Sequence, residues 1–262
     1  MINVVELWLI SLSLINLILF TIGLIVFMPK KVYKTSIDEF YRIFKEQRLY
    51  LIIIFGVVLF HLIEVNIIDS TVTEWIGYDF ANNIQHIEGN IIYLLSQYWT
   101  PAIVYFLVIM YIAVYPFTLW FSPIYFIATD EKKAMKTLAY GLLLIYSIAL
   151  PFYLFMPITN VYTFYNLESA LSNVIPTVEN FFYITTTQNN CLPSLHVAMS
   201  ILIARSVHLT GNKKLSYFTY FCTASVIISV IYLAIHWITD VICGTLLAIV
   251  TIFLLNQFIK DE

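Results

Sequence analysis

The sequence predicts an all-α integral membrane protein in which about seven transmembrane helices form a bundle. Of the 262 residues, 61% are hydrophobic and 11% are charged, whereas soluble domains contain about 45–50% apolar and about 25% charged residues. The apolar residues also gather in seven runs close to the length of about 20 residues that a spanning helix needs. No basic stripe occurs, which excludes a nucleic-acid-binding protein.

Polar or proline-containing segments separate the seven runs. Pro29 and two lysines end the first run, and Pro101 suits the first turn of the third. We expect spans at 7–28, 49–68, 100–121, 134–156, 193–209, 216–233 and 237–259. No internal repeat or low-complexity linker divides the chain. We therefore expect one membrane domain, 1–262, with a catalytic core at about 100–259 and the two remaining spans within 1–99.

Two further segments predict amphipathic helices that lie in the membrane interface. In 34–48, apolar side chains recur at i, i+3, i+4 and i+7, and many of the remaining positions are charged. Segment 69–99 has acidic residues but neither Lys nor Arg, and apolar residues repeat along it at helical spacing. Tyr98 and Trp99 end this segment, as aromatic residues of an interfacial belt do.

The basic residues predict the orientation in the membrane. The 13 Lys and Arg residues fall in four stretches, with six in 30–48, three in 132–136, three in 205–214 and one at 260. With seven spans, all four stretches lie on one side, which the positive-inside rule assigns to the cytoplasm. We expect a multi-pass plasma-membrane protein with its N-terminus outside, its C-terminus inside, and the starts of the fifth and seventh spans at the outer face.

The fifth span begins with the sequence Cys-Leu-Pro-Ser-Leu-His at 191–196. Pro193 suits the first turn of a helix, so Ser194 and His196 would lie at a helix N-terminus, where free N–H groups and the helix dipole bind anions. Asn189 and Asn190 directly precede this sequence. They are interpreted either as caps of the helix or as contacts of a ligand.

The seventh span begins with His236 and Asp240, which lie four residues apart. On one helix face the carboxylate bonds one imidazole nitrogen, which leaves the other nitrogen as a nucleophile or base. His196, facing this pair, would protonate a leaving group. Ionisable groups at a membrane edge are costly and usually functional. These three residues fit phosphoryl transfer through a phosphohistidine.

The motif Pro-Ser-Leu-His at 193–196, with His-Trp-Ile-Thr-Asp at 236–240, resembles the type 2 phosphatidic acid phosphatase superfamily, whose motifs are of the types Pro-Ser-Gly-His and Ser-Arg-x5-His-x3-Asp. The sequence details are similar to the branch that contains inositol phosphorylceramide synthase. The resemblance implies that His236 is the nucleophile, that Asp240 orients it and that His196 is the general acid. It also implies a helical bundle that is open to lipids and works without a metal or other cofactor.

The chain departs from the superfamily pattern at the basic residues. The motif Lys-x6-Arg-Pro is absent, and Val230 stands at the arginine position. We therefore expect helix N-termini, a protonated His196 and uncharged donors to hold the phosphate. The donors we expect are Ser194, Asn189, Asn190, Tyr232 and Gln97. Such a site favours a membrane lipid phosphodiester or polyprenyl diphosphate, or headgroup transfer to an alcohol acceptor; hydrolysis and transfer both stay open.

Two other functions use the same residues. His196, His236 and Asp240 match a metal site with two histidines and one carboxylate, although no metal is our first expectation. Intramembrane ionisable residues also mark lipid-transport paths without catalysis. In the second span, His61 is interpreted as a packing residue and Glu64 as either a buried polar partner or a substrate contact.

The three cysteines have neither paired nor metal-ligand spacing. They are interpreted as small apolar residues of the core. A disulfide between Cys191 and Cys243 is the alternative, because both are expected near the outer face, where disulfides persist.

Overall fold

The computed structural model describes residues 4–174, 182–183 and 185–259. In this part of the chain all regular elements are helical, and the one β-type contact is an isolated bridge between Ile158 and Asn190. The α-helices are α1 (Val4–Phe27), α2 (Ile37–Ile63), α3 (Asp69–Ile76), α4 (Ala81–Glu88), α5 (Ile91–Ser96), α6 (Pro101–Ile109), α7 (Tyr115–Thr129), α8 (Lys132–Phe155), α9 (Val161–Phe164), α10 (Ala170–Val174), α12 (Leu195–His208), α13 (Lys213–Tyr232) and α14 (Ile238–Phe258).

Single π-helical turns join two pairs of these helices end to end. Glu64–Ile68 connects α2 to α3, and Met110–Val114 connects α6 to α7. Counting joined helices as one, the described residues form six helices that are long and apolar enough to cross a membrane, and a shorter apolar helix, α12. The all-α multi-span fold predicted from the sequence is confirmed.

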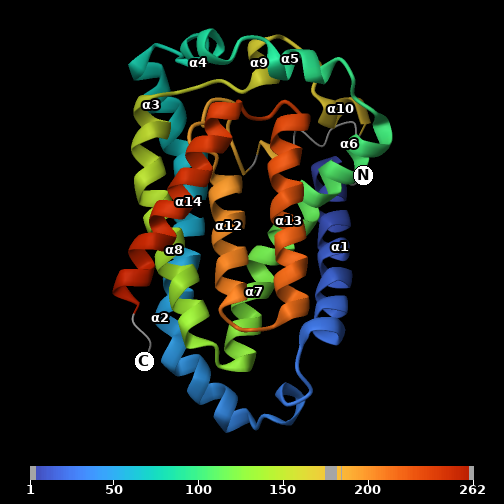
Figure 1. Ribbon diagram of the computed structural model, residues 1–262, viewed down its shortest axis with the longest axis vertical. Coiled ribbons are helices and arrows are strands. Elements are labelled where there is room, and N and C mark those ends of the chain that lie inside the picture. Colours follow the sequence, from blue (N-terminus) through green and yellow to red (C-terminus); the bar gives the residue numbers. More distant parts are fainter. Residues whose placement is uncertain (1–3, 175–181, 184, 260–262) are drawn as a thin grey trace.

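The long helices run side by side, and α4, α5 and α9 lie across one end of the bundle (Figure 1). Helix α12 packs against α7, α8, α13 and α14, so it forms the centre of the bundle. It has 14 residues, a length of about 21 Å, against a hydrocarbon core of about 30 Å. The irregular chain before α12 therefore lies inside the bundle rather than above it, which requires that protein or a cavity surround it.

Two of the predicted elements have different bounds. Segment 34–48 is not a separate interfacial helix, because α2 runs without a break from Ile37 to Ile63. Ser36 caps the start of α2, since its Oγ accepts the Glu39 N–H at 3.2 Å. The single interfacial helix expected in 69–99 is also wrong. Gly77 (φ 63°) ends α3 and Gly89 (φ 67°) ends α4, so the segment forms three short helices.

Helix α14 approaches the start of α12 closely at a glycine. A Cβ atom added to Gly244 would lie 2.5 Å from the Ser194 carbonyl oxygen. This oxygen accepts the Ala198 N–H at 3.1 Å in the first turn of α12. Glycine at this position therefore lets α14 support the loop that leads into α12.

We predict that Gly244→Ala destabilises the protein by about 1–3 kcal/mol, because the added methyl group overpacks a backbone contact that cannot move alone. Gly56→Ala is the matched control, since Gly56 lies within α2 and the methyl group that this substitution adds would have no neighbouring atom within 4 Å. Thermal unfolding of the purified variants in detergent measures the difference. Equal midpoints for the two variants would contradict the close contact.

Candidate active site

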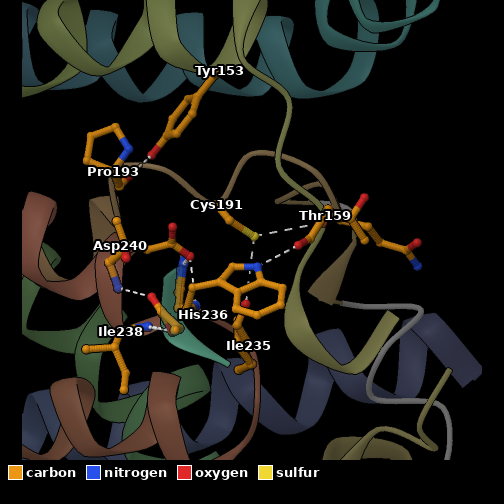
Figure 2. A network of polar contacts seen from close by, with 12 residues as sticks. Tyr153, Thr159, Cys191, Pro193, Ile235, His236, Ile238 and Asp240 are labelled. Carbon is orange, nitrogen blue, oxygen red and sulfur yellow. Dashed lines mark hydrogen bonds and ion pairs between the residues drawn. The ribbon is translucent and has the colours of Figure 1, made fainter. Parts of the chain in front are cut away.

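Asp240 holds His236 at the start of α14. The Asp240 side chain is fully buried, and its Oδ2 accepts hydrogen bonds from His236 Nδ1 at 3.2 Å and from the Trp237 N–H at 2.8 Å. Figure 2 shows this arrangement. Because Nδ1 donates to the carboxylate, Nε2 carries the lone pair of the neutral imidazole. The side chain of His236 also lines a cavity, so the pair can present a nucleophile or base to a ligand.

The turn before His236 is fixed by backbone contacts. The N–H groups of Ile235 and His236 both donate to the Val230 carbonyl oxygen, at 3.0 and 2.9 Å. Ala234 has a left-handed φ of 54°, a conformation that residues with a Cβ rarely adopt and that often accompanies functional sites. Trp237 is buried, and its Nε1 donates to the Thr159 carbonyl oxygen at 2.9 Å. The imidazole therefore projects from a rigid corner between α13 and α14.

The loop that leads into α12 is bound to this corner. The Ser194 N–H donates to the backbone oxygen of Asp240 at 3.0 Å, and the Tyr153 hydroxyl donates to the Pro193 carbonyl oxygen at 2.6 Å. His196 follows in the first turn of α12, with its ring centroid 6.4 Å from that of His236. The tertiary structure thus brings the three predicted catalytic residues together.

His196 and His236 line one cavity of about 330 Å³. Its walls come from α1, α2, α7, α8 and α12 and from the loops before α12 and α14, and no Lys or Arg is among its described lining residues. Tyr111 packs on His196 with a centroid distance of 4.6 Å. The faces of α1 and α2 that point away from the bundle are exposed, so these two helices are its outermost ones. The cavity therefore extends from the two histidines to the outermost helices.

The predicted substrate-binding residues divide into two groups. Asn190 lines the cavity, whereas the described lining includes none of the others. Asn189 donates to Thr73 Oγ1 at 2.9 Å, and Ser194 is fully buried at the N-cap of α12. Gln97 is exposed at the end of α5, and the Tyr232 hydroxyl donates to the Tyr98 carbonyl oxygen at 3.3 Å.

The N-terminus of α14 is already occupied by a carboxylate. Glu88 of α4 accepts the Ile238 N–H at 3.0 Å and also the Thr239 N–H. The sequence did not single out Glu88, and its distance along the chain gave no sign of this contact. The N-terminus of α12, where the sequence predicts an anion site, has no carboxylate partner in the described contacts, and its Ser194 side chain makes no capping hydrogen bond.

Glu64 is a buried partner of the loop that carries Asn190. Its side chain is fully buried on the π-helical turn after α2. One carboxylate oxygen accepts from Asn190 Nδ2 at 3.0 Å, and the other accepts from the Tyr146 hydroxyl at 3.2 Å and lies 3.6 Å from His61 Nδ1. Because an ionised carboxylate only accepts, Asn190 turns its amide oxygen away from Glu64, and that oxygen makes no hydrogen bond to the residues that the structure describes.

All three cysteines are free thiols, so the alternative of a Cys191–Cys243 disulfide is wrong. Cys191 is buried next to the Ile235 carbonyl oxygen, and Cys243 is partly exposed on α14. Burial raises the pKa of the Cys191 thiol well above its usual value. Among the described residues, the group that could hold a metal is Cys191, His236 and Asp240, so Cys191 replaces His196 in the set that the sequence suggested.

The fold and site define a multi-span membrane protein with a buried His–Asp pair that faces a second histidine across an apolar cavity. The family model described as the PAP2 superfamily matches residues 90–254. This match covers more than half of the chain, and the protein belongs to the PAP2 superfamily. Superfamily membership supports a phosphatase or phosphotransferase kind of activity.

Other comparisons add little about function. The chain is similar to an uncharacterized protein of Methanocaldococcus jannaschii, with 43% identity over 68 residues, which are 26% of this chain and 27% of that relative. The chain thus matches about a quarter of the length of this relative. No solved structure matches the chain.

We predict that Glu64→Ala destabilises the protein by about 1–3 kcal/mol, because Asn190 and Tyr146 lose a buried acceptor. Glu74→Ala, at an exposed position of α3, is the matched control and should change stability by at most about 0.5 kcal/mol. Thermal unfolding in detergent compares the two variants. A Glu64→Ala protein as stable as the control would show that the buried network contributes nothing.

Proposed function

We propose that this protein is a membrane lipid phosphatase or headgroup phosphotransferase that forms a phosphohistidine at His236. The observation that carries the proposal is the His236–Asp240 hydrogen bond, which leaves Nε2 free next to a cavity that also contains His196. The kind of activity agrees with membership of the PAP2 superfamily.

The proposed reaction has two steps. In the first, His236 Nε2 attacks phosphorus, the bond from phosphorus to the leaving oxygen breaks, and His196 gives its proton to that oxygen. In the second, water or an alcohol attacks the phosphohistidine, the P–N bond breaks, and His196 takes the proton of the attacking hydroxyl. Asp240 keeps the imidazole of His236 in the tautomer that both steps need.

The cavity supports a lipid as the substrate. Its lining is largely apolar and reaches α1 and α2, which suits an acyl or prenyl chain that enters from the bilayer. The same wall contains three buried polar atoms that make no hydrogen bond within the described part of the chain and can therefore bind a polar group of a ligand. They are Tyr111 Oη, Thr187 Oγ1 and Asn190 Oδ1.

The missing basic residues restrict the phosphate group that fits. No Lys or Arg is among the described lining residues of the cavity, and a multiply charged phosphate usually has such partners. A phosphodiester, or transfer of a headgroup to an alcohol acceptor, therefore suits the site better than a phosphate monoester or a polyprenyl diphosphate, which both carry more than one negative charge. We also propose that the protein is related to the inositol phosphorylceramide synthase branch, which its motifs at 193–196 and 236–240 resemble.

We predict that His236→Ala abolishes phosphate or headgroup release and covalent phosphoryl labelling by the purified protein in excess chelator. Asp240→Asn should lower the rate by at least about 100-fold, because it favours the wrong imidazole tautomer. His86→Ala, at an exposed position of α4, is the matched control. A polyprenyl diphosphate, a phosphatidic acid and a phosphodiester lipid are the substrates to compare.

Two outcomes of this experiment would overturn the proposal. Full activity of the His236→Ala protein would remove His236 as the nucleophile. A folded wild-type protein that binds lipid but gives neither release nor a covalent label, with or without an alcohol acceptor, would instead identify a lipid-binding or lipid-transport protein.

We also propose that the active site faces the outside of the plasma membrane, because the basic residues gather at the opposite end of the spans. We predict that a membrane-impermeant maleimide labels Glu74→Cys on α3 in intact cells, whereas Lys213→Cys at the start of α13 reacts only after permeabilisation. Both positions are exposed, and α3 lies at the opposite end of the bundle from the connection between α12 and α13 (Figure 1). The reverse pattern would contradict this orientation.

A further inference from the structure

Cys191 lies beside the His236–Asp240 pair but takes no part in the reaction proposed above. Its Sγ is 3.8 Å from the Ile235 carbonyl oxygen and 3.9 Å from the Gln188 carbonyl oxygen, contacts that are weak because a thiol is a poor donor. The side chain is buried and also lines the cavity. Figure 2 shows the sulfur close to the corner that carries His236.

Three different ligand atoms meet at this corner. The Cys191 sulfur, a ring nitrogen of His236 and a carboxylate oxygen of Asp240 all lie within 4.8 Å of one another. An independent observation concerns the second carboxylate oxygen. Asp240 Oδ2 accepts two hydrogen bonds, but Oδ1 is buried and has no hydrogen-bond partner among the described residues. A buried carboxylate oxygen without a donor is unfavourable, so Oδ1 is a free ligand atom within a fully buried side chain.

The donor set matches zinc. Thiolate, imidazole and carboxylate are the usual protein ligands of Zn²⁺, which takes three protein ligands and one water in open sites. A thiolate, a carboxylate and a neutral imidazole around Zn²⁺ have no net charge, which reduces the cost of burying the ion. Zinc displaces the proton of a thiol that coordinates it. Cys191 and His236 both line the cavity, so two of the three ligand residues face a space from which an ion can bind.

We propose that Cys191, His236 and Asp240 form a binding site for a zinc ion that inhibits phosphoryl transfer. The ion takes the imidazole and the carboxylate that the nucleophile needs, so zinc and a phosphohistidine exclude each other at this site. The site differs from the set suggested by the sequence, because the thiol of Cys191 takes the place of His196. The binding of zinc is independent of the proposed function, whereas the inhibition depends on it.

The binding test uses the purified full-length protein after treatment with chelator and removal of the chelator. Equilibrium dialysis with zinc should give about one ion per chain in the wild type. Cys191→Ser and Cys191→Ala each remove a ligand of the ion. Each should weaken zinc binding by at least roughly 10–100-fold, which is the loss of affinity when a residue that supports a metal ligand is removed. Cys243→Ser is the matched control, because Cys243 is a partly exposed free thiol of α14, and it should bind zinc as the wild type does.

Cadmium provides a spectroscopic test of the sulfur ligand. Sulfur-to-cadmium charge-transfer absorption should appear in the wild type and in Cys243→Ser but be absent in both Cys191 variants. Thermal unfolding checks that the Cys191 variants are folded. Zinc binding that is absent in the wild type, or unchanged in both folded Cys191 variants, would overturn the site.

Activity measurements separate this inference from the proposed function. For each protein, the activity with zinc is divided by the activity of the same protein without zinc. This ratio should be larger for the two Cys191 variants than for the wild type and Cys243→Ser. Zinc binding that needs Cys191 in a protein without phosphoryl-transfer activity would support the site and reject the proposed function. Activity that needs His236 but is insensitive to zinc, or increased by it, would reject the inhibition alone.

Discussion

The carboxylate of Asp240 is the group on which the arrangement of the site depends. Its Oδ2 accepts the Nδ1–H of His236 and the N–H of Trp237, so one oxygen both orients the imidazole and caps α14. The backbone oxygen of Asp240 accepts the N–H of Ser194, the last residue before α12. Two motifs that are 40 residues apart in the sequence are thereby fixed in position by a single residue. The side chain of Asp240 orients the imidazole, and its backbone binds the residue that precedes α12, so one residue determines both the geometry of the site and the packing around it.

The sequence predicted the spans well and their ends less well. Composition and run length identify a helix inside a bilayer, because the bilayer admits few other structures. The start of α2 was misjudged because an amphipathic period is the same in an interfacial helix and in the extension of a span. A tertiary contact decides between them: Gln47 is buried and donates to Asp130 Oδ1 at 3.0 Å. Such a contact, 83 residues apart, has no signal in a local pattern.

The candidate site shows the same division. His196, His236 and Asp240 stand out because ionisable groups are rare in apolar segments, and the structure places them together. Tyr232 and Gln97 were chosen by residue type and by the expected side of the membrane, which says nothing about their distance from His236. Glu64 is an ionisable residue within an apolar span, so the sequence indicated that it matters. Its partners Asn190 and Tyr146 could not be predicted, because they are more than 80 residues away in the sequence. The sequence left open whether Glu64 contacts the substrate or supports other buried residues. The fold favours the second role, because the side chain is fully buried against Asn190 and Tyr146.

Electrostatics limits what this cavity can accept. Glu88 occupies the N-terminus of α14, so a phosphate cannot use it as an anion site. Asp240 and Glu64 add buried carboxylates near the histidines, and no Lys or Arg is among the described lining residues of the cavity. A dianionic phosphate would meet uncompensated negative charge in a medium that screens it poorly. A phosphodiester carries one charge, and headgroup transfer to an alcohol keeps that charge unchanged from substrate to product. Under the proposed function, these charges favour the exchange of one ester of phosphate for another over the release of free phosphate.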